Sequence, residues 1–205
     1  MLALIVMDYM LGAVGTTEER QVRKKVAVLG HSFVRDLSLS AGIPLSYDPN
    51  KIALCRKFFV PGATVSSIQT GTVWERFLAY QPDLTFLIIG GNDITVTSQP
   101  NNIARAIIAL GKKIKDLTGG EVRFISIERR PVPRNISAVR YNRQRTSINR
   151  FLKKPRDNFV VGRLIFSEAK DHDSQDGVHL RPRAMQDLSA NLEWHINKYA
   201  SENNW

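Results

Sequence analysis

The sequence predicts an α/β protein, a sandwich in which helices pack around a central, mainly parallel sheet of five strands. The first observation is a series of short apolar runs, the pattern of strands that are buried on both faces of a parallel sheet. The second is that segments with apolar residues at helical spacing stand between these runs. Because strands that alternate with helices form parallel sheets, one α/β domain accounts for most of the 205 residues.

The apolar runs and the helical segments alternate five times along the chain. The run at 84–89 is the most strongly apolar, and the segment 101–117 shows clear helical spacing before Gly119 and Gly120 stop it. Residues 40–51 carry glycine, proline, aspartate and asparagine and predict a loop. The predicted strands cover residues 26–29, 53–60, 84–89, 122–127 and 159–166, and the predicted helices cover residues 33–39, 64–80, 101–117, 137–153 and 182–199.

One domain is expected at residues 22–200, with an N-terminal extension at 1–21 and a short tail at 201–205. The extension starts with apolar residues, but Asp8 interrupts them and no Lys or Arg precedes them, unlike a secretion signal. Its apolar run is also too short to span a bilayer. The single cysteine, Cys55, stands among apolar residues, which indicates a buried thiol and excludes an internal disulfide. These features favour a location inside the cell.

The chain carries a net charge of +10. Such an excess favours polyanionic partners, which include nucleic acid, an acidic membrane surface and anionic substrates. Aromatic residues do not alternate with the basic ones as they do in proteins that bind single-stranded nucleic acid. A solvated basic surface is therefore the first interpretation, and nucleic acid as a partner is the second.

The stretch that organises the chain leads from the first strand through Gly30 and His31 to Ser32. This serine stands at the carboxyl end of a strand and at the amino end of a helix. Backbone N–H groups and the helix dipole favour developing negative charge there. Ser32 is therefore a candidate nucleophile, although a helix cap is the simpler explanation when the serine is taken alone.

Three other loops are expected at the same edge, because the carboxyl ends of parallel strands gather there. Asp176 and His179 stand three residues apart around a glycine. They could therefore pair as a base for a serine hydroxyl and the acid that orients this base. The Gly62 N–H and the Asn92 side-chain amide are candidate oxyanion donors beside the N–H of Ser32. Each of the two is also explained as an ordinary turn residue.

Other functions fit the residues less well. The acidic loop holds five potential metal ligands, but their spacing fits no compact zinc motif, so we expect no metal and no cofactor. A dinucleotide-binding turn needs three glycines where this chain has only Gly30. An α/β-hydrolase would need a GxSxG elbow, which is absent. Asp93 is expected to cap a helix or to brace its loop. The five potential ligands are Asp171, His172, Asp173, Asp176 and His179.

Four short blocks of this sequence resemble, in order, the motif blocks of the SGNH (GDSL-type) hydrolases. The likeness implies a flavodoxin-like three-layer α/β/α sandwich and hydrolysis of carboxylic esters without a cofactor. It implies that Ser32 is the nucleophile, His179 the base and Asp176 its orienting acid, with Ser32, Gly62 and Asn92 forming the oxyanion hole. The blocks are Gly30-His31-Ser32, Gly62, Gly90-Gly91-Asn92-Asp93 and Asp176-Gly177-Val178-His179.

The chain departs from this family at His31, where aspartate is common. Adjacent side chains on such a turn diverge, and His179 already has an acidic neighbour, so we expect His31 to support the site rather than to act as its base. The string from Leu29 to Arg35 is also similar to SGNH-like domains of retrotransposon-derived open reading frames.

Two functional hypotheses follow from these observations. The first is a serine hydrolase that cleaves acyl or acetyl esters of small molecules or lipids through an acyl-enzyme on Ser32. The second is a catalytically weak SGNH-like binding module, associated with nucleic acid in a retroelement-derived protein. The positive charge, His31 and the retrotransposon-like string favour the second hypothesis.

Overall fold

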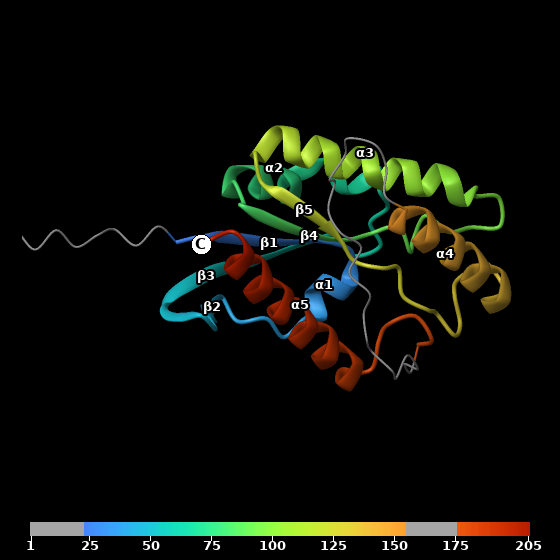
Figure 1. Cartoon of the computed structure of the whole chain (residues 1–205). Coiled ribbons are helices and arrows are strands. Elements are labelled where there is room, and N and C mark those ends of the chain that lie inside the picture. The colour runs from blue at the N-terminus through green and yellow to red at the C-terminus, as the bar shows by residue number, and fades with distance from the viewer. Residues whose placement is uncertain (1–22, 155–175) are drawn as a thin grey trace, which may run out of the picture.

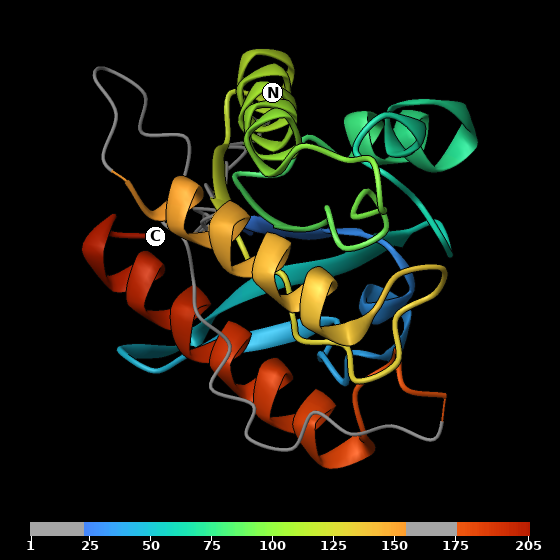
Figure 2. The ribbon, with the colours of Figure 1, turned by 90° about the vertical axis from the view of Figure 1, so that its right-hand side faces the viewer.

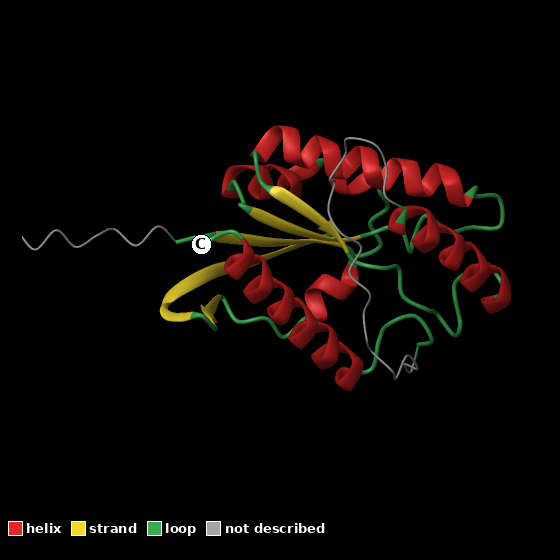
Figure 3. Ribbon diagram, viewed as in Figure 1, coloured by secondary structure: helices red, strands yellow, loops and turns green. Residues whose placement is uncertain are grey.

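The computed structural model describes residues 23–154 and 176–205, and these form an α/β sandwich (Figure 1). Its helices lie on both faces of one central sheet, as the predicted fold class requires (Figure 3). The strands are β1 (Lys25–Gly30), β2 (Gly42–Leu45), β3 (Asp48–Phe59), β4 (Leu84–Ile88) and β5 (Glu121–Phe124). The helices are α1 (Ser32–Asp36), α2 (Gly71–Tyr80), α3 (Pro100–Thr118), α4 (Ala138–Lys153) and α5 (Pro182–Glu202), and a 3₁₀ turn, η1, covers Ser67–Gln69.

The sheet has the strand order β2-β3-β1-β4-β5. Strands β3, β1, β4 and β5 run parallel, whereas β2 pairs antiparallel with β3 as a hairpin at the edge. The first described strand, β1, therefore lies in the middle of the sheet, and later strands are added on both sides. This order leaves the carboxyl end of β1 between those of β3 and β4, in a crevice typical of ligand sites in open α/β sheets.

Alternation of side chains along the strands creates two cores. Ala27 and Leu29 face the layer that contains α2 and α3, and α4 packs beside α3 in that layer (Figure 2). Val26 and Val28 face the opposite layer, which contains α1 and α5. Both faces of β1 are therefore covered, which explains why its apolar run is continuous rather than alternating.

The loop predicted at residues 40–51 is wrong. This segment contains β2 and the first residues of β3, joined as a hairpin. Ile43 and Leu45 are buried, and Pro44 between them is exposed on an edge strand, where the missing N–H of proline is tolerated. Only two apolar positions mark this strand, so its turn-forming residues dominate the local pattern. The strand predicted at 159–166 lies outside the described residues.

Several predicted element boundaries also differ from the structure. The helix predicted at 64–80 is divided, because Gly71 has φ of +77° and starts α2 only after η1. The first helix ends at Asp36 instead of residue 39. The strand predicted at 122–127 corresponds to β5, which ends at Phe124. Beyond it, a backbone bond from Ile125 N to Leu87 O (3.0 Å) continues the pairing with β4. Helix α5 extends to Glu202, and the buried ring of Trp205 packs against Tyr199.

Of the helices in the described parts of the chain, none combines the length and the apolar character that a membrane crossing requires.

Candidate active site

Ser32 is placed by a close approach of β1 to β4. A Cβ atom at Gly30 would lie 2.0 Å from the carbonyl oxygen of Ile88, so only glycine fits at this position. The next N–H, that of His31, donates to the same carbonyl oxygen at 3.2 Å. Ser32 then begins α1, and the cap of this helix is His31, whose Nδ1 accepts the N–H of Phe33 at 3.4 Å. The helix-cap explanation of Ser32 is therefore wrong, and its hydroxyl is available for another partner.

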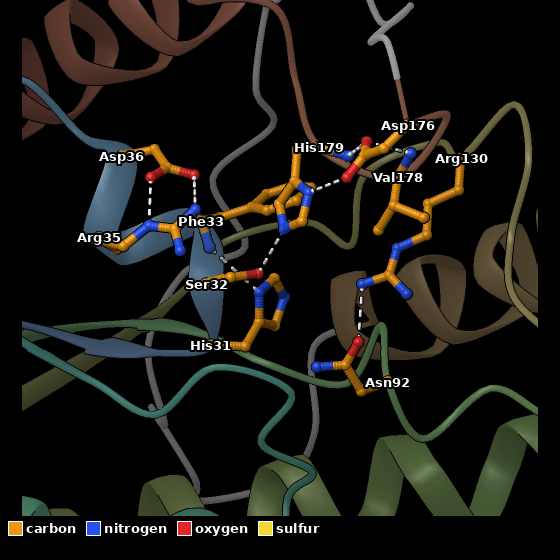
Figure 4. Close-up of polar contacts among 10 residues, drawn as sticks. All are labelled: His31, Ser32, Phe33, Arg35, Asp36, Asn92, Arg130, Asp176, Val178 and His179. Atoms are coloured by element: carbon orange, nitrogen blue, oxygen red, sulfur yellow. Dashed lines mark hydrogen bonds and ion pairs between the residues drawn. The ribbon is translucent and has the colours of Figure 1, made fainter.

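That partner is His179, from the loop that precedes α5 (Figure 4). Its Nε2 lies 2.9 Å from Oγ of Ser32, and its Nδ1 lies 2.5 Å from Oδ2 of Asp176. The three side chains form one continuous hydrogen-bonded chain. In such a chain the carboxylate holds the proton on Nδ1, which leaves Nε2 as the acceptor for the serine proton.

The loop that carries Asp176 and His179 is shaped by its own short contacts. Oδ1 of Asp176 accepts the N–H groups of Val178 and His179 at 3.0 and 2.9 Å, while its other oxygen contacts the imidazole. Gly177 between them has φ of +68°, and its carbonyl accepts the N–H of Val132 at 2.9 Å. One carboxylate therefore both forms the turn and orients the histidine.

The candidate oxyanion donors come from three neighbouring loops. Among the described residues, no acceptor is bonded to the backbone N–H of Ser32 or of Gly62. Asn92 donates one Nδ2 hydrogen to the carbonyl oxygen of Ala63 at 2.9 Å. Val60 N also donates to Gly30 O at 3.1 Å. The loops after β1, β3 and β4 are thus bonded to one another, with two unbonded N–H groups among them.

Asp93 braces this arrangement, the second of the two roles expected for it. Both of its carboxylate oxygens accept the N–H of Val65, at 3.1 and 3.2 Å. Burial raises the pKa of Asp93, and the bonds from Val65 and from its own backbone N–H oppose that rise. Asp93 therefore joins the loop after β4 to the loop after β3 rather than entering the hydrogen-bonded chain of Ser32.

His31 is buried, with 4% of its surface exposed. Burial, followed by the electrostatic influence of Arg130 and of His179, lowers its pKa to about 3. The imidazole is therefore neutral at physiological pH, caps α1 and packs edge-on against Phe33, with ring centroids 4.9 Å apart. These contacts place His31 next to the nucleophile but outside the chain that leads from Ser32 to Asp176.

Arg130 is a residue of this site that no motif singled out, although the loop at 129–135 was expected to shape the pocket. It follows β5 in a stretch rich in arginine and proline, a composition typical of an exposed basic loop, yet only 7% of its surface is exposed. Its Nη2 donates to Oδ1 of Asn92 at 3.0 Å, and its guanidinium lies over the ring of Tyr141, 5.3 Å from the centroid. No local pattern separates this arginine from its exposed neighbours Arg129 and Arg134.

No group of three metal-ligating side chains occurs in the parts of the chain that the structure describes. Asp176 and His179 are engaged with each other and with Ser32. The other three potential ligands of the acidic loop, Asp171, His172 and Asp173, lie outside the described residues.

Comparisons with known proteins agree with this architecture. No family model and no curated protein matches the sequence. Solved structures do match the fold, among them a carbohydrate esterase family 3 protein from Talaromyces cellulolyticus. It has a TM-score of 0.60 and 13% identity, over 87% of this chain and 99% of that one.

Two further structural neighbours are bacterial. Axe2, an acetylxylan esterase from Geobacillus stearothermophilus, has a TM-score of 0.57 and 12% identity, over 86% of this chain and 96% of that one. The lipase/acylhydrolase from Enterococcus faecalis has a TM-score of 0.57 and 13% identity over the same shares. At these identities the likeness shows the fold alone.

Proposed function

We propose that this protein is a serine hydrolase of SGNH type that cleaves carboxylic esters through an acyl-enzyme on Ser32. The observation that carries the proposal is the hydrogen-bonded chain from Ser32 Oγ through the His179 imidazole to the Asp176 carboxylate. A serine hydroxyl is a weak nucleophile unless an oriented base takes its proton, and this chain supplies such a base.

The proposed reaction has two halves. In the first, His179 Nε2 takes the proton from Ser32 as Oγ bonds to the ester carbonyl carbon. The C–O bond to the alcohol then breaks, and the imidazolium returns that proton to the leaving alcohol. In the second half, a water molecule gives a proton to His179 and its oxygen bonds to the acyl carbon. The bond from that carbon to Ser32 Oγ then breaks, and the imidazolium returns the proton to Oγ, which releases the acid and restores Ser32. The negative oxygen of each tetrahedral intermediate would be bound by the N–H groups of Ser32 and Gly62 and by Asn92.

The structural neighbours support a carboxylic ester as the substrate class. They are named as esterases of carbohydrates, an acetylxylan esterase and a lipase, so the scissile bond they share is an acyl or acetyl ester. In this proposal the nucleophile, the base and the orienting acid are all side chains of the protein. Acetylated sugars and lipid esters are the two substrate types to compare.

The nucleophile can be tested without the natural substrate. Purified protein is treated with a fluorophosphonate probe and, separately, with p-nitrophenyl acetate. The Ser32→Ala variant is expected to lose both labelling and turnover, whereas Ser40→Ala, which changes an exposed serine, keeps both. Undiminished labelling of the Ser32→Ala variant would reject the assignment.

The nucleic-acid-binding hypothesis, including the retroelement origin, stays a prediction. It is separated from the hydrolase by a gel-shift measurement at several salt concentrations, since contacts with phosphates weaken steeply as salt is added. Salt-dependent binding, together with no Ser32-dependent turnover, would favour the binding module over the enzyme.

A further inference from the structure

Arg130 is a buried cation in the candidate site. None of the ion pairs among the described residues involves it. Burial lowers its pKa, Tyr141 and Asp176 raise it, and Arg134 lowers it further. A guanidinium nevertheless stays protonated in proteins, because its ordinary pKa is far above neutrality. Its positive charge is therefore held inside the candidate site, where among the described residues it forms no ion pair.

Space for this guanidinium is made by the backbone of the third motif block. A Cβ atom at Gly91 would lie 2.9 Å from Nη2 of Arg130 and 3.1 Å from the hydroxyl of Tyr141. The glycine before Asn92 thus lets the guanidinium approach the asparagine side chain. His31, Phe33 and Arg130 also line the same small cavity behind the site.

The contacts of Asn92 define which way its amide points. Arginine has no acceptor, so the atom of Asn92 that faces Arg130 must be Oδ1. The carbonyl of Ala63 has no donor, so the atom that faces it must be Nδ2. A flipped amide would lose both bonds at once. The second Nδ2 hydrogen is left over, and in the view of Figure 4 this nitrogen is on the side of Asn92 toward His31 and Ser32.

We propose that Arg130 is a positioning residue that holds the Asn92 amide with its nitrogen toward the oxyanion, an inference that rests on the proposed esterase function. The guanidinium acts through Asn92 in two ways. It fixes the amide before substrate arrives, so no reorganisation is needed when charge develops. Its bond to Oδ1 also polarises the amide, which strengthens the donor on Nδ2.

The test is a double-mutant cycle of Arg130 and Asn92, read as kcat and KM for p-nitrophenyl acetate. Asn92→Ala is expected to lower kcat about 10²- to 10³-fold, the usual effect of one lost oxyanion donor. Arg130→Met should lower kcat about 10- to 100-fold with KM within about twofold, because only transition-state binding is weakened. The double variant should be no more than about threefold slower than Asn92→Ala, because Arg130 has nothing left to position. Arg130→Lys should recover part of the rate.

The matched control is Arg129→Met, which removes an exposed arginine from the adjacent position and should leave kcat unchanged. Ser32→Ala is measured in the same series. A wild-type rate equal to that of Ser32→Ala rejects the esterase and the inference with it. Two results would overturn the inference but not the esterase. In the first, the rate depends on Ser32 but Arg130→Met leaves kcat unchanged. In the second, the fold-losses of kcat in Arg130→Met and Asn92→Ala multiply in the double variant.

Circular dichroism and thermal unfolding verify that each variant is folded. If Arg130→Met does not fold, the neutral but polar Arg130→Gln replaces it in the cycle. If Arg130→Gln lowers kcat in the wild-type protein but not in the Asn92→Ala variant, the inference is again supported. If Arg130→Gln leaves kcat unchanged, or lowers it by the same factor in both proteins, the inference is overturned.

Discussion

Nε2 of His179 lies 2.9 Å from Oγ of Ser32, although 147 positions separate the two residues in the sequence. The serine is held by the close approach of β1 to Ile88, and the histidine by the turn that Asp176 forms. The two supports come from separate segments of the chain. The contact therefore joins two locally built halves, and three substitutions test what each half contributes.

Asp176→Asn tests the orienting carboxylate. The amide oxygen can still accept the N–H groups of Val178 and His179, so the turn is expected to persist. The amide nitrogen would face Nδ1 of His179 as a donor and favour the wrong tautomer. We expect kcat for p-nitrophenyl acetate to fall about 10³- to 10⁴-fold, with the thermal unfolding midpoint close to that of the wild type. A loss below tenfold would show that Asp176 only shapes the loop.

His31→Asn tests whether a buried neutral histidine weakens the fold in acid. The folded-state pKa of about 3 lies below the ordinary value of 6.5, so the unfolded chain binds the proton more readily. His31 therefore contributes stability that is present above pH 6.5 and is lost as the pH falls toward 3. Between pH 7 and pH 5 this amounts to about 2 kcal/mol.

The measurement is the free energy of unfolding in urea at pH 7 and pH 5. Asparagine is a good helix cap and can accept the N–H of Phe33 in place of the imidazole. Between pH 7 and pH 5 the free energy of unfolding of the variant should fall by about 2 kcal/mol less than that of the wild type. The carboxylates are the same in both proteins, so their contribution cancels in this comparison. Equal losses in both proteins would contradict a neutral, buried His31.

Gly177→Ala tests the packing of the loop that carries the acid and the base. At φ of +68°, an alanine there would be strained, and its Cβ would lie 2.4 Å from Cβ of Val132. We expect an alanine to push the loop away from Val132 and to separate His179 from Ser32. The free energy of unfolding should fall by about 2–4 kcal/mol, and kcat should fall at least about tenfold.

Gly119→Ala is the matched control, because Gly119 has φ of +70° but a Cβ atom added there would have no neighbouring atom within 4 Å. The free energy of unfolding of this control should fall only by the cost of placing an alanine at positive φ, about 1 kcal/mol, and its activity should be unchanged. Similar effects of the two substitutions would show that backbone strain, rather than the contact with Val132, holds the loop.

The positions of the strongest elements followed from local pattern. The run at 84–89 and the spacing at 101–117 predict β4 and α3 to within one or two residues, because burial on both faces or along one stripe leaves a regular mark. The hairpin strand β2 was missed, because Ile43 and Leu45 mark it only weakly among turn residues and its stability comes from pairing with β3.

By itself, the sequence indicated which residues carry the candidate chemistry: Ser32, Gly62 and Asn92, which follow β1, β3 and β4, and the pair Asp176 and His179, which precedes α5. A strand that ends in a turn points to Ser32, and a three-residue spacing points to the pair of Asp176 and His179. The oxyanion roles of Gly62 and Asn92 are implied mainly by the resemblance to the SGNH hydrolases. Only the tertiary structure decided that Ser32 meets His179, that His31 caps α1, and that Arg130 is buried against Asn92. Such contacts depend on strand order and on loops that pack across the sheet edge, and chain-distant packing of this kind leaves no periodic trace in the residues themselves.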